Sequence, residues 1–265
     1  MDELERALKK VIENLRSKEE VDAVFLTGSG GRSPLKPWSD IDLIIVFQKN
    51  TKQLYSLFTW IGGRFADIFF FDLGDMARIE KKRIIGGNTP EGTFVDWLKS
   101  GSIQFDKSGK TTELKALIAR GKIKCRITRE DVFSFQRKVS YNYTANNRYF
   151  SAKDPLYHEA LELRLLYSVI ELALAYFVLR GIPWRGEKNA MKYFKQKDGK
   201  YYTALARYFA ARDLKTRMKL YNQMVPMALT KQYGIFPKSK IIAVAHKDSY
   251  AHSVALTKYW KKLVS

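Results

Sequence analysis

The sequence predicts an α+β protein, in which a mixed-sheet domain (residues 1–120) precedes an all-α helical bundle domain (residues 121–265). Short apolar runs bounded by glycine-rich turns are concentrated in the first 120 residues, and long stretches with helical periodicity fill most of the rest. The charge divides in the same way. Lys and Arg number 19 against 17 Asp and Glu up to residue 120, and 28 against 10 after it, giving net charges of +2 and +18. This asymmetry indicates two units with different roles, the second of which faces an anion.

Four apolar runs in the first half predict strands. Residues 21–27 end at a glycine-rich turn, and residues 41–47 are apolar almost throughout, as in a strand buried on both faces. Residues 65–71 have the same character apart from Asp67, and residues 102–105 predict an edge strand. We therefore expect a sheet with these strands in its core and at one edge.

Helical periodicity separates these strands. Residues 3–18 predict an amphipathic helix, and residues 53–61, 75–84 and 92–99 predict three more helices around the sheet. Residues 107–109 (Lys-Ser-Gly) predict a turn after the edge strand.

The second half is predicted to be helical. Thr128 with Asp131 three residues later indicates a capped helix start, and Asp154-Pro155 begins a long helix that ends at Gly181. The expected helices are residues 128–149, 155–181, 187–197, 202–211, 214–233 and 249–263, with one possible strand at residues 240–245.

The composition excludes several classes of protein. With 265 residues, 46% of them hydrophobic, and a net charge of +20, the chain has too much apolar material for a disordered basic tail. The lone Cys125 excludes a disulfide framework and a cysteine-based zinc site, and three scattered histidines argue against a histidine-rich metal site. A hard metal held by carboxylates remains compatible with this composition.

The pattern at the N-terminus and in the most apolar stretch points away from membranes. Residues 1–16 mix acids and bases with leucine, unlike a signal peptide. Residues 161–178 contain Glu162, Arg164 and Glu171, which favours a buried helix over a membrane span. We expect a cytoplasmic protein with no membrane partner.

The residues that indicate chemistry lie between the first two predicted strands. Gly28-Ser29 is followed, after ten residues, by Asp40-Ile41-Asp42. Because side chains alternate along a strand, Asp40 and Asp42 point to the same side, with Cα atoms about 6 to 7 Å apart. Two carboxylates this close repel unless a cation lies between them. Magnesium suits them, since it prefers oxygen ligands and is usually held by one or two carboxylates plus substrate phosphates.

The loop before these carboxylates suits a polyphosphate. Its glycine-rich turn lets the backbone approach a phosphate, and Ser29 adds a hydroxyl donor beside Gly28. Arg32 and Lys36 in the same loop balance the phosphate charge. Asp67, on the third strand, supplies a third acidic group.

Together these residues resemble the signature of the DNA polymerase beta type nucleotidyltransferase superfamily, which has a palm-like mixed sheet. The spacing from Gly28 to Arg32 and the string Ser39-Asp40-Ile41-Asp42-Leu43 are similar to the minimal and the antibiotic (kanamycin and lincosamide type) nucleotidyltransferases. The motif covers residues 24–72. A helical second domain is common in such two-domain enzymes.

The resemblance implies a two-metal transfer of a nucleoside monophosphate. Asp40 and Asp42 would bind magnesium, Asp67 would complete the second metal site and help to deprotonate the acceptor, and the triphosphate would lie on Gly28, Ser29 and Arg32. Asp72 is the alternative third carboxylate. It has the opposite strand parity and adjoins Leu73-Gly74, so it is interpreted as a turn or cap residue.

Basic and aromatic residues of the second half offer further contacts. Residues 180–188 form a basic loop that leads into a helix N-terminus, where Arg185 and Lys188 are candidates for nucleotide binding. Aromatic residues among basic ones, such as Tyr141 and Tyr149, suit base stacking or ordinary helix packing. His158 is interpreted as a packing residue.

Three functions remain open. The first is transfer from magnesium-bound nucleoside triphosphate, with ATP favoured, to the hydroxyl of a small molecule. The positive charge disfavours a polycationic aminoglycoside as acceptor. The second is the same chemistry on RNA, such as a tRNA end, or on a protein hydroxyl. The third is a non-catalytic antitoxin-like or nucleotide-sensing module.

Overall fold

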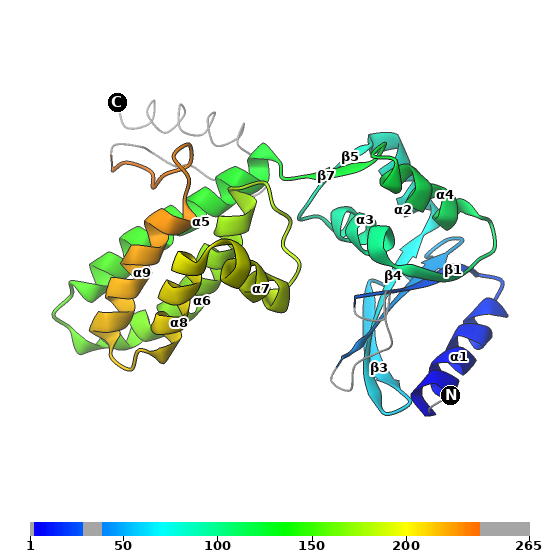
Figure 1. The fold of residues 1–265 in the computed structure, drawn as a ribbon, viewed down its shortest axis with the longest axis horizontal. Coiled ribbons are helices and arrows are strands. Elements are labelled where there is room, and N and C mark those ends of the chain that lie inside the picture. Colours follow the sequence, from blue (N-terminus) through cyan, green and yellow to red (C-terminus); the bar gives the residue numbers. More distant parts are fainter. Residues whose placement is uncertain (1–2, 29–38, 239–265) are drawn as a thin grey trace. The chain divides into compact units, whose positions relative to one another are not determined.

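The computed structural model describes residues 3–28 and 39–238, which divide into two compact units after Arg126 (Figure 1). The first unit combines a sheet with helices, and the described part of the second is helical, so the predicted fold class is confirmed. The predicted domain division after residue 120 stays a prediction, because compactness alone does not show that either unit folds by itself.

The first unit contains a five-stranded mixed sheet in the order β3-β4-β2-β1-β6. Strands β2 and β4 are parallel, and the other neighbours are antiparallel. A second, two-stranded parallel sheet joins β5 to β7. The elements of this unit are α1 (Glu3–Arg16), β1 (Val21–Thr27), β2 (Ile41–Phe47), β3 (Ser56–Ile61), β4 (Arg64–Asp72), α2 (Leu73–Lys82), β5 (Ile84–Gly86), α3 (Pro90–Ser100), β6 (Ser102–Asp106), α4 (Lys110–Ala119) and β7 (Lys124–Arg126).

Helices cover both faces of the five-stranded sheet, as Figure 1 shows. Helix α1 packs on one face against side chains that include Leu43 and Ile45. Helices α2, α3 and α4 pack on the other face against Phe25, Ile44 and Val46. Strands β1 and β2 are apolar on both faces for this reason, which is the pattern their sequences predict.

The predicted helix at residues 53–61 is wrong. Residues Ser56–Ile61 form strand β3, which pairs with β4 as a hairpin. Gly62 and Gly63 make its two-residue turn, with φ of 55° and 73°. Such turns need positive φ at both central positions, which glycine adopts without steric cost. The Gly-Gly pair between two apolar runs was therefore the stronger signal, and the helical periodicity misled.

The other predicted elements of the first unit appear with small changes at their ends. Strands occur at the four predicted places, β6 is an edge strand, and helices α1, α2 and α3 match three of the four expected helices. Helix α4 and the short strands β5 and β7 were not predicted.

The second unit is built around one large apolar core. Thr128 and Asp131 form the predicted capping box, and Asp154 caps the helix that begins at Pro155. The described helices are α5 (Arg129–Phe150), α6 (Pro155–Val178), α7 (Glu187–Lys197), α8 (Gly199–Ala210) and α9 (Leu214–Ala228).

The end of the described chain differs from the predicted helix at residues 214–233. Helix α9 ends at Ala228, not at residue 233, just after Pro226, which lacks an N–H for the helix. The predicted strand at 240–245 and helix at 249–263 lie outside the described residues. Among the described helices, none is long and apolar enough to cross a membrane.

Candidate active site

Asp42 and Asp67 lie side by side in the middle of the sheet. They are direct partners in the parallel register of β2 and β4. Neighbouring strands are about 4.8 Å apart, and partners in register point to the same face. Both side chains are partly exposed. The sheet therefore presents two carboxylates together, near the N-terminal ends of two parallel strands.

Thr27 on β1, Asp42 on β2 and Asp67 on β4 form a row of neighbours across three strands. Thr27 is the antiparallel partner of Asp42, is buried, and donates its hydroxyl to the carbonyl of Trp97 at 3.4 Å. Trp97 belongs to α3, so the row lies on the sheet face that α3 covers further along the strands. Because its hydroxyl is already bonded, Thr27 anchors the end of β1 beside the carboxylates.

Gly28 brings the main chain against Asp42. It has a φ of 61°, and a Cβ atom added at this position would lie 2.0 Å from Oδ2 of Asp42. Any larger residue would therefore collide with the carboxylate as well as adopt an unfavourable backbone conformation. The predicted close approach of Gly28 to a ligand stays a prediction.

Asp40 lies immediately before β2 and is exposed. The residue before it, Ser39, is buried, and its carbonyl accepts a hydrogen bond of 2.8 Å from Nη1 of Arg64 at the start of β4. This bond ties the segment that carries Asp40 to the strand that carries Asp67. Sequence reasoning missed Arg64, because one charged residue at the start of a strand looks like an ordinary solvated side chain.

The carboxylates suit a hard cation, although they do not form a closed metal cage. Within residues 3–28 and 39–238, no group of three His, Cys, Asp or Glu side chains converges closely enough to hold a metal ion. Magnesium does not require such a group, since it keeps waters and takes substrate phosphates as ligands beside one or two carboxylates. The oxygen donors of Asp42 and Asp67, next to the exposed Asp40, fit that chemistry.

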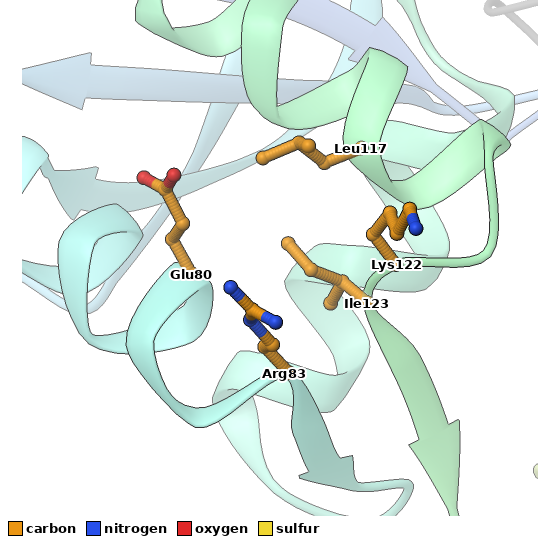
Figure 2. Close-up of a pocket in the computed structure, with 5 residues that line it drawn as sticks. All are labelled: Glu80, Arg83, Leu117, Lys122 and Ile123. Carbon is orange, nitrogen blue, oxygen red and sulfur yellow. The ribbon is translucent and has the colours of Figure 1, made fainter.

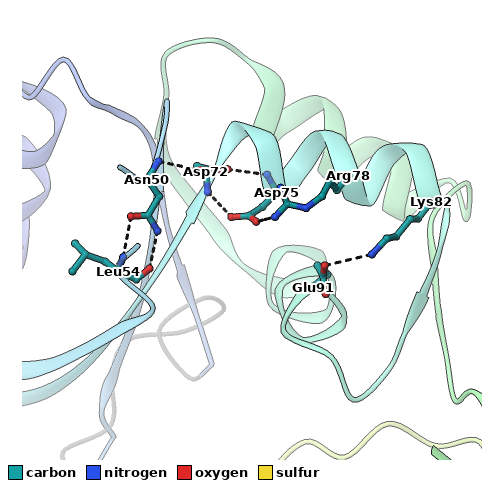
Figure 3. Close-up of polar contacts among 7 residues, drawn as sticks. All are labelled: Asn50, Leu54, Asp72, Asp75, Arg78, Lys82 and Glu91. Atoms are coloured by element: carbon teal, nitrogen blue, oxygen red, sulfur yellow. Dashed lines mark hydrogen bonds and ion pairs between the residues drawn. The ribbon is translucent and has the colours of Figure 1, made fainter. Parts of the chain in front are cut away.

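Asp72, the alternative third carboxylate, is a helix cap (Figure 3). Its Oδ1 accepts from the backbone N–H of Asp75, and its Oδ2 accepts from the backbone N–H of Asn50 at 3.0 Å. Burial alone would raise the pKa of Asp72, but backbone hydrogen bonds from Asn50, Asp75 and Gly74, with the charge of Arg78, bring this pKa below its ordinary value. The interpretation of Asp72 as a cap is confirmed.

The other predicted nucleotide contacts are not brought to the carboxylates by the described structure. Ser29, Arg32 and Lys36 lie outside the described residues. Arg185 and Lys188 are exposed, in the loop before α7 and in its first turn. They belong to the second unit, so their predicted contact with nucleotide stays a prediction. Arg180, in the same basic loop, donates to the carbonyls of Met227 and Ala228 and thus holds the end of α9.

A small pocket elsewhere in the first unit is separate from this site (Figure 2). It lies between the end of α2 and the segment after α4. None of its lining residues belongs to the row of Thr27, Asp42 and Asp67, so it has no part in the arrangement above. The residues that line it are Glu80, Arg83, Leu117, Lys122 and Ile123.

Part of the chain matches a known protein family. Residues 8–91 match the family described as a nucleotidyltransferase domain. The matched range contains Gly28, Asp40, Asp42 and Asp67. No curated protein matches the chain. A solved structure of a nucleotidyltransferase-like protein from Exiguobacterium sibiricum 255-15 is similar over 84% of this chain and 73% of its own, with 12% identity and a TM-score of 0.47.

Proposed function

We propose that the chain, whose residues 8–91 match a nucleotidyltransferase domain of the DNA polymerase beta type superfamily, transfers a nucleoside monophosphate from ATP to the hydroxyl of a small molecule. The acceptor oxygen forms a bond to the α-phosphorus. The bond from that phosphorus to the oxygen bridging to the β-phosphate breaks, and pyrophosphate leaves with the electron pair. The hydroxyl proton passes to a nearby base.

The observation that carries this proposal is the register that makes Asp42 and Asp67 neighbours, with Gly28 against Asp42. Asp42 then lies beside Gly28, the first residue of the segment proposed for the triphosphate, and Asp67 lies one strand further from Gly28. This is the order that an in-line displacement needs, with leaving group and acceptor on opposite sides of the reacting phosphorus.

In the proposed mechanism, Asp40 and Asp42 would hold one magnesium ion, and Asp67 would complete the site of a second. When bound, these ions would stabilise the charge on the attacking and the leaving oxygen. Asp67 accepts the proton of the acceptor hydroxyl or orients that hydroxyl, since Asp67 is the carboxylate further from Gly28. Arg64 keeps the segment of Asp40 in place through the carbonyl of Ser39.

The triphosphate is proposed to lie on Gly28, Ser29, Arg32 and Lys36, with Arg185 and Lys188 as further contacts from the second unit. A main chain with positive φ at Gly28 presents amide groups rather than side chains to an anion. The N-terminus of α7 begins without a side-chain cap on its first N–H groups, which favours a phosphate nearby.

RNA, such as a tRNA end, is the second candidate acceptor. The charge of +18 after residue 120 favours it, because a polyanion is attracted to such a surface. A protein hydroxyl is a further possibility within the same chemistry. A non-catalytic antitoxin-like or nucleotide-sensing module would not need three carboxylates at this place, so the presence of Asp40, Asp42 and Asp67 argues for an enzyme.

The test is a labelling experiment with α-³²P-labelled ATP, magnesium, and separate pools of small hydroxyl compounds, RNA and proteins. We expect label in the small-molecule pool. Asp42→Asn and Asp67→Asn are each expected to reduce labelling on the order of a hundredfold or more, because each substitution removes a charged metal ligand. Label only in RNA or protein would identify the alternative acceptor.

Asp72→Asn is the matched control on the same strand as Asp67. Asparagine is about as good as aspartate at a helix N-cap, so this variant is expected to fold and to label the acceptor normally. Undiminished labelling by Asp42→Asn and Asp67→Asn would show that the carboxylate pair is not the metal site.

A further inference from the structure

Three aromatic side chains adjoin Asp67 on the same face of the sheet. Phe58 is the direct antiparallel partner of Asp67, and Trp60 is the partner of Phe65. Residues two apart on a strand share a face, so Phe58, Trp60, Phe65 and Asp67 all point the same way. The rings contact one another, with centroids 6.2 Å apart for Phe58 and Phe65 and 5.8 Å apart for Trp60 and Phe65. We call Phe58, Trp60 and Phe65 the aromatic trio.

Two rings of the trio are largely open to solvent. Phe58 is 73% exposed and Trp60 is 69% exposed. On the other side of Asp67 along β4, the ring of Phe69 packs on Trp97 at 4.5 Å, and Phe71 is buried. Adjacent large apolar side chains left open on a folded domain are typical of a binding surface.

We propose that the aromatic trio binds a planar ring of the acceptor and so presents the acceptor's hydroxyl to Asp67. This proposal rests on the proposed function. In the strand order β3-β4-β2-β1, the trio lies on β3 and β4, and Gly28 follows β1. The trio and Gly28 thus lie on opposite sides of the two carboxylates. Phe58 faces Asp67 across a strand pair, a spacing at which opposite Cβ atoms are about 5 Å apart.

Charge on these strands favours a small, uncharged acceptor over the end of an RNA chain. Strand β3 has no charged residue, and β4 has one basic residue, Arg64, which already donates to the carbonyl of Ser39. A chain of phosphates beside the trio would therefore find few cations on β3 and β4, and phosphate contacts dominate the binding of nucleic acids. A flat ring needs only the open ring faces.

Ligand-observed NMR on the full-length protein tests the subsite without any turnover. The probes are two glucosides that differ only in the ring, phenyl β-D-glucoside and cyclohexyl β-D-glucoside, together with uridine. We expect saturation transfer to the phenyl and uridine ring protons, and several-fold less to cyclohexyl glucoside. Phe58→Ala is expected to weaken binding of the ring probes about fivefold or more, and Phe58→Trp is expected to restore it.

Leu57→Ala is the matched control. Leu57 directly precedes Phe58 on β3, is 49% exposed, and points to the opposite face of the sheet. This variant is expected to bind the probes like the wild type, and thermal melting of both alanine variants checks that they fold. Equal weakening in Leu57→Ala, or no weakening in Phe58→Ala, would overturn the subsite. So would an absence of ring binding in the wild type.

Separate measurements keep this proposal distinct from the proposed function. Asp67→Asn is expected to stop labelling of the acceptor while ring probes still bind, so ring binding without transfer would refute the function alone. With a labelled acceptor in hand, Phe58→Ala is expected to raise the acceptor KM and leave the KM for ATP unchanged. A rise only in the KM for ATP would show that the trio holds the nucleotide base, which would overturn the acceptor subsite.

Discussion

At the residue scale, the carboxylate of Asp42 leaves no room for a side chain at Gly28. A Cβ atom at position 28 would need space that Oδ2 of Asp42 already occupies, at 2.0 Å. Gly63 has a similar positive φ, but a Cβ atom there would meet nothing within 4 Å. Substitutions at the two glycines therefore distinguish the effect of backbone strain from the effect of a collision with the carboxylate.

Gly28→Ala is expected to abolish most labelling of the acceptor, because Asp42 must move out of its position beside Asp67. Gly63→Ala is expected to keep its activity. Both variants should lose about 1 to 2 kcal/mol of unfolding free energy from the left-handed backbone conformation. Labelling assays and urea unfolding of the two variants check this. Equal activity of the two variants would show that the contact with Asp42 is unimportant.

At the element scale, Asp72 links the sheet to α2. It is the last residue of β4, caps α2, and also holds the backbone of Asn50 after β2. Strands β2 and β4 carry Asp42 and Asp67, so this cap stabilises the end of the strand pair remote from the carboxylates. Figure 3 shows the hydrogen bonds that converge on Asp72.

Asp72→Ala is expected to destabilise the first unit by about 1 to 2 kcal/mol at neutral pH, as for loss of a helix N-cap. The lowered pKa of Asp72 means that its carboxylate is favoured in the folded state. The stabilisation is therefore present above the ordinary aspartate pKa of about 4 and is lost as the pH falls through the lowered value. Urea unfolding of both proteins across this range should show the difference shrinking only in acid; a difference that persists unchanged at low pH would contradict the assignment.

The β3–β4 hairpin shows where local patterns mislead. The periodicity of residues 53–61 predicts a helix, but the Gly62-Gly63 turn and pairing with β4 make residues Ser56–Ile61 a strand. Pairing with a neighbour overrides weak local preference, because strand stability depends on cross-strand packing. The aromatic trio follows from this correction, since on a helix Phe58 and Trp60 would not share a face.

At the scale of the whole molecule, the two units have separate cores. The apolar clusters around the five-stranded sheet contain only residues from the first unit, and the core of the helical unit contains only residues after Arg126. A unit with its own core is expected to fold by itself.

A fragment ending at Arg126 is expected to unfold cooperatively in urea, as followed by circular dichroism. A fragment ending at residue 120 is expected to be less stable by about 2 to 5 kcal/mol, because it lacks the buried Ile123 and the strand β7 that pairs with β5. Equal stability of the two fragments would place the domain boundary at residue 120. Failure of the longer fragment to fold would show that the first unit depends on the second.

The sequence by itself determined the properties that depend on neighbouring residues. Local sequence predicts the apolar runs of β1 and β2 and the face of the strand on which Asp42 lies. It also predicts the capping pair Thr128 and Asp131 and gives the charge of the second half. Asp67 and Asp72 were distinguished by strand parity and by the Leu73-Gly74 that follows Asp72, and the cap at Asp72 agrees with that reasoning.

Only the tertiary structure decided which strands are neighbours. Pairing between β2 and β4 is parallel and spans residues far apart in the chain, and it is set by the packing of the whole sheet between its helices. That pairing makes Asp42 and Asp67 adjacent, and the β3–β4 pairing puts Phe58 beside Asp67. No local pattern specifies these neighbours, because a strand sequence determines which face a side chain takes but not which strand lies next to it.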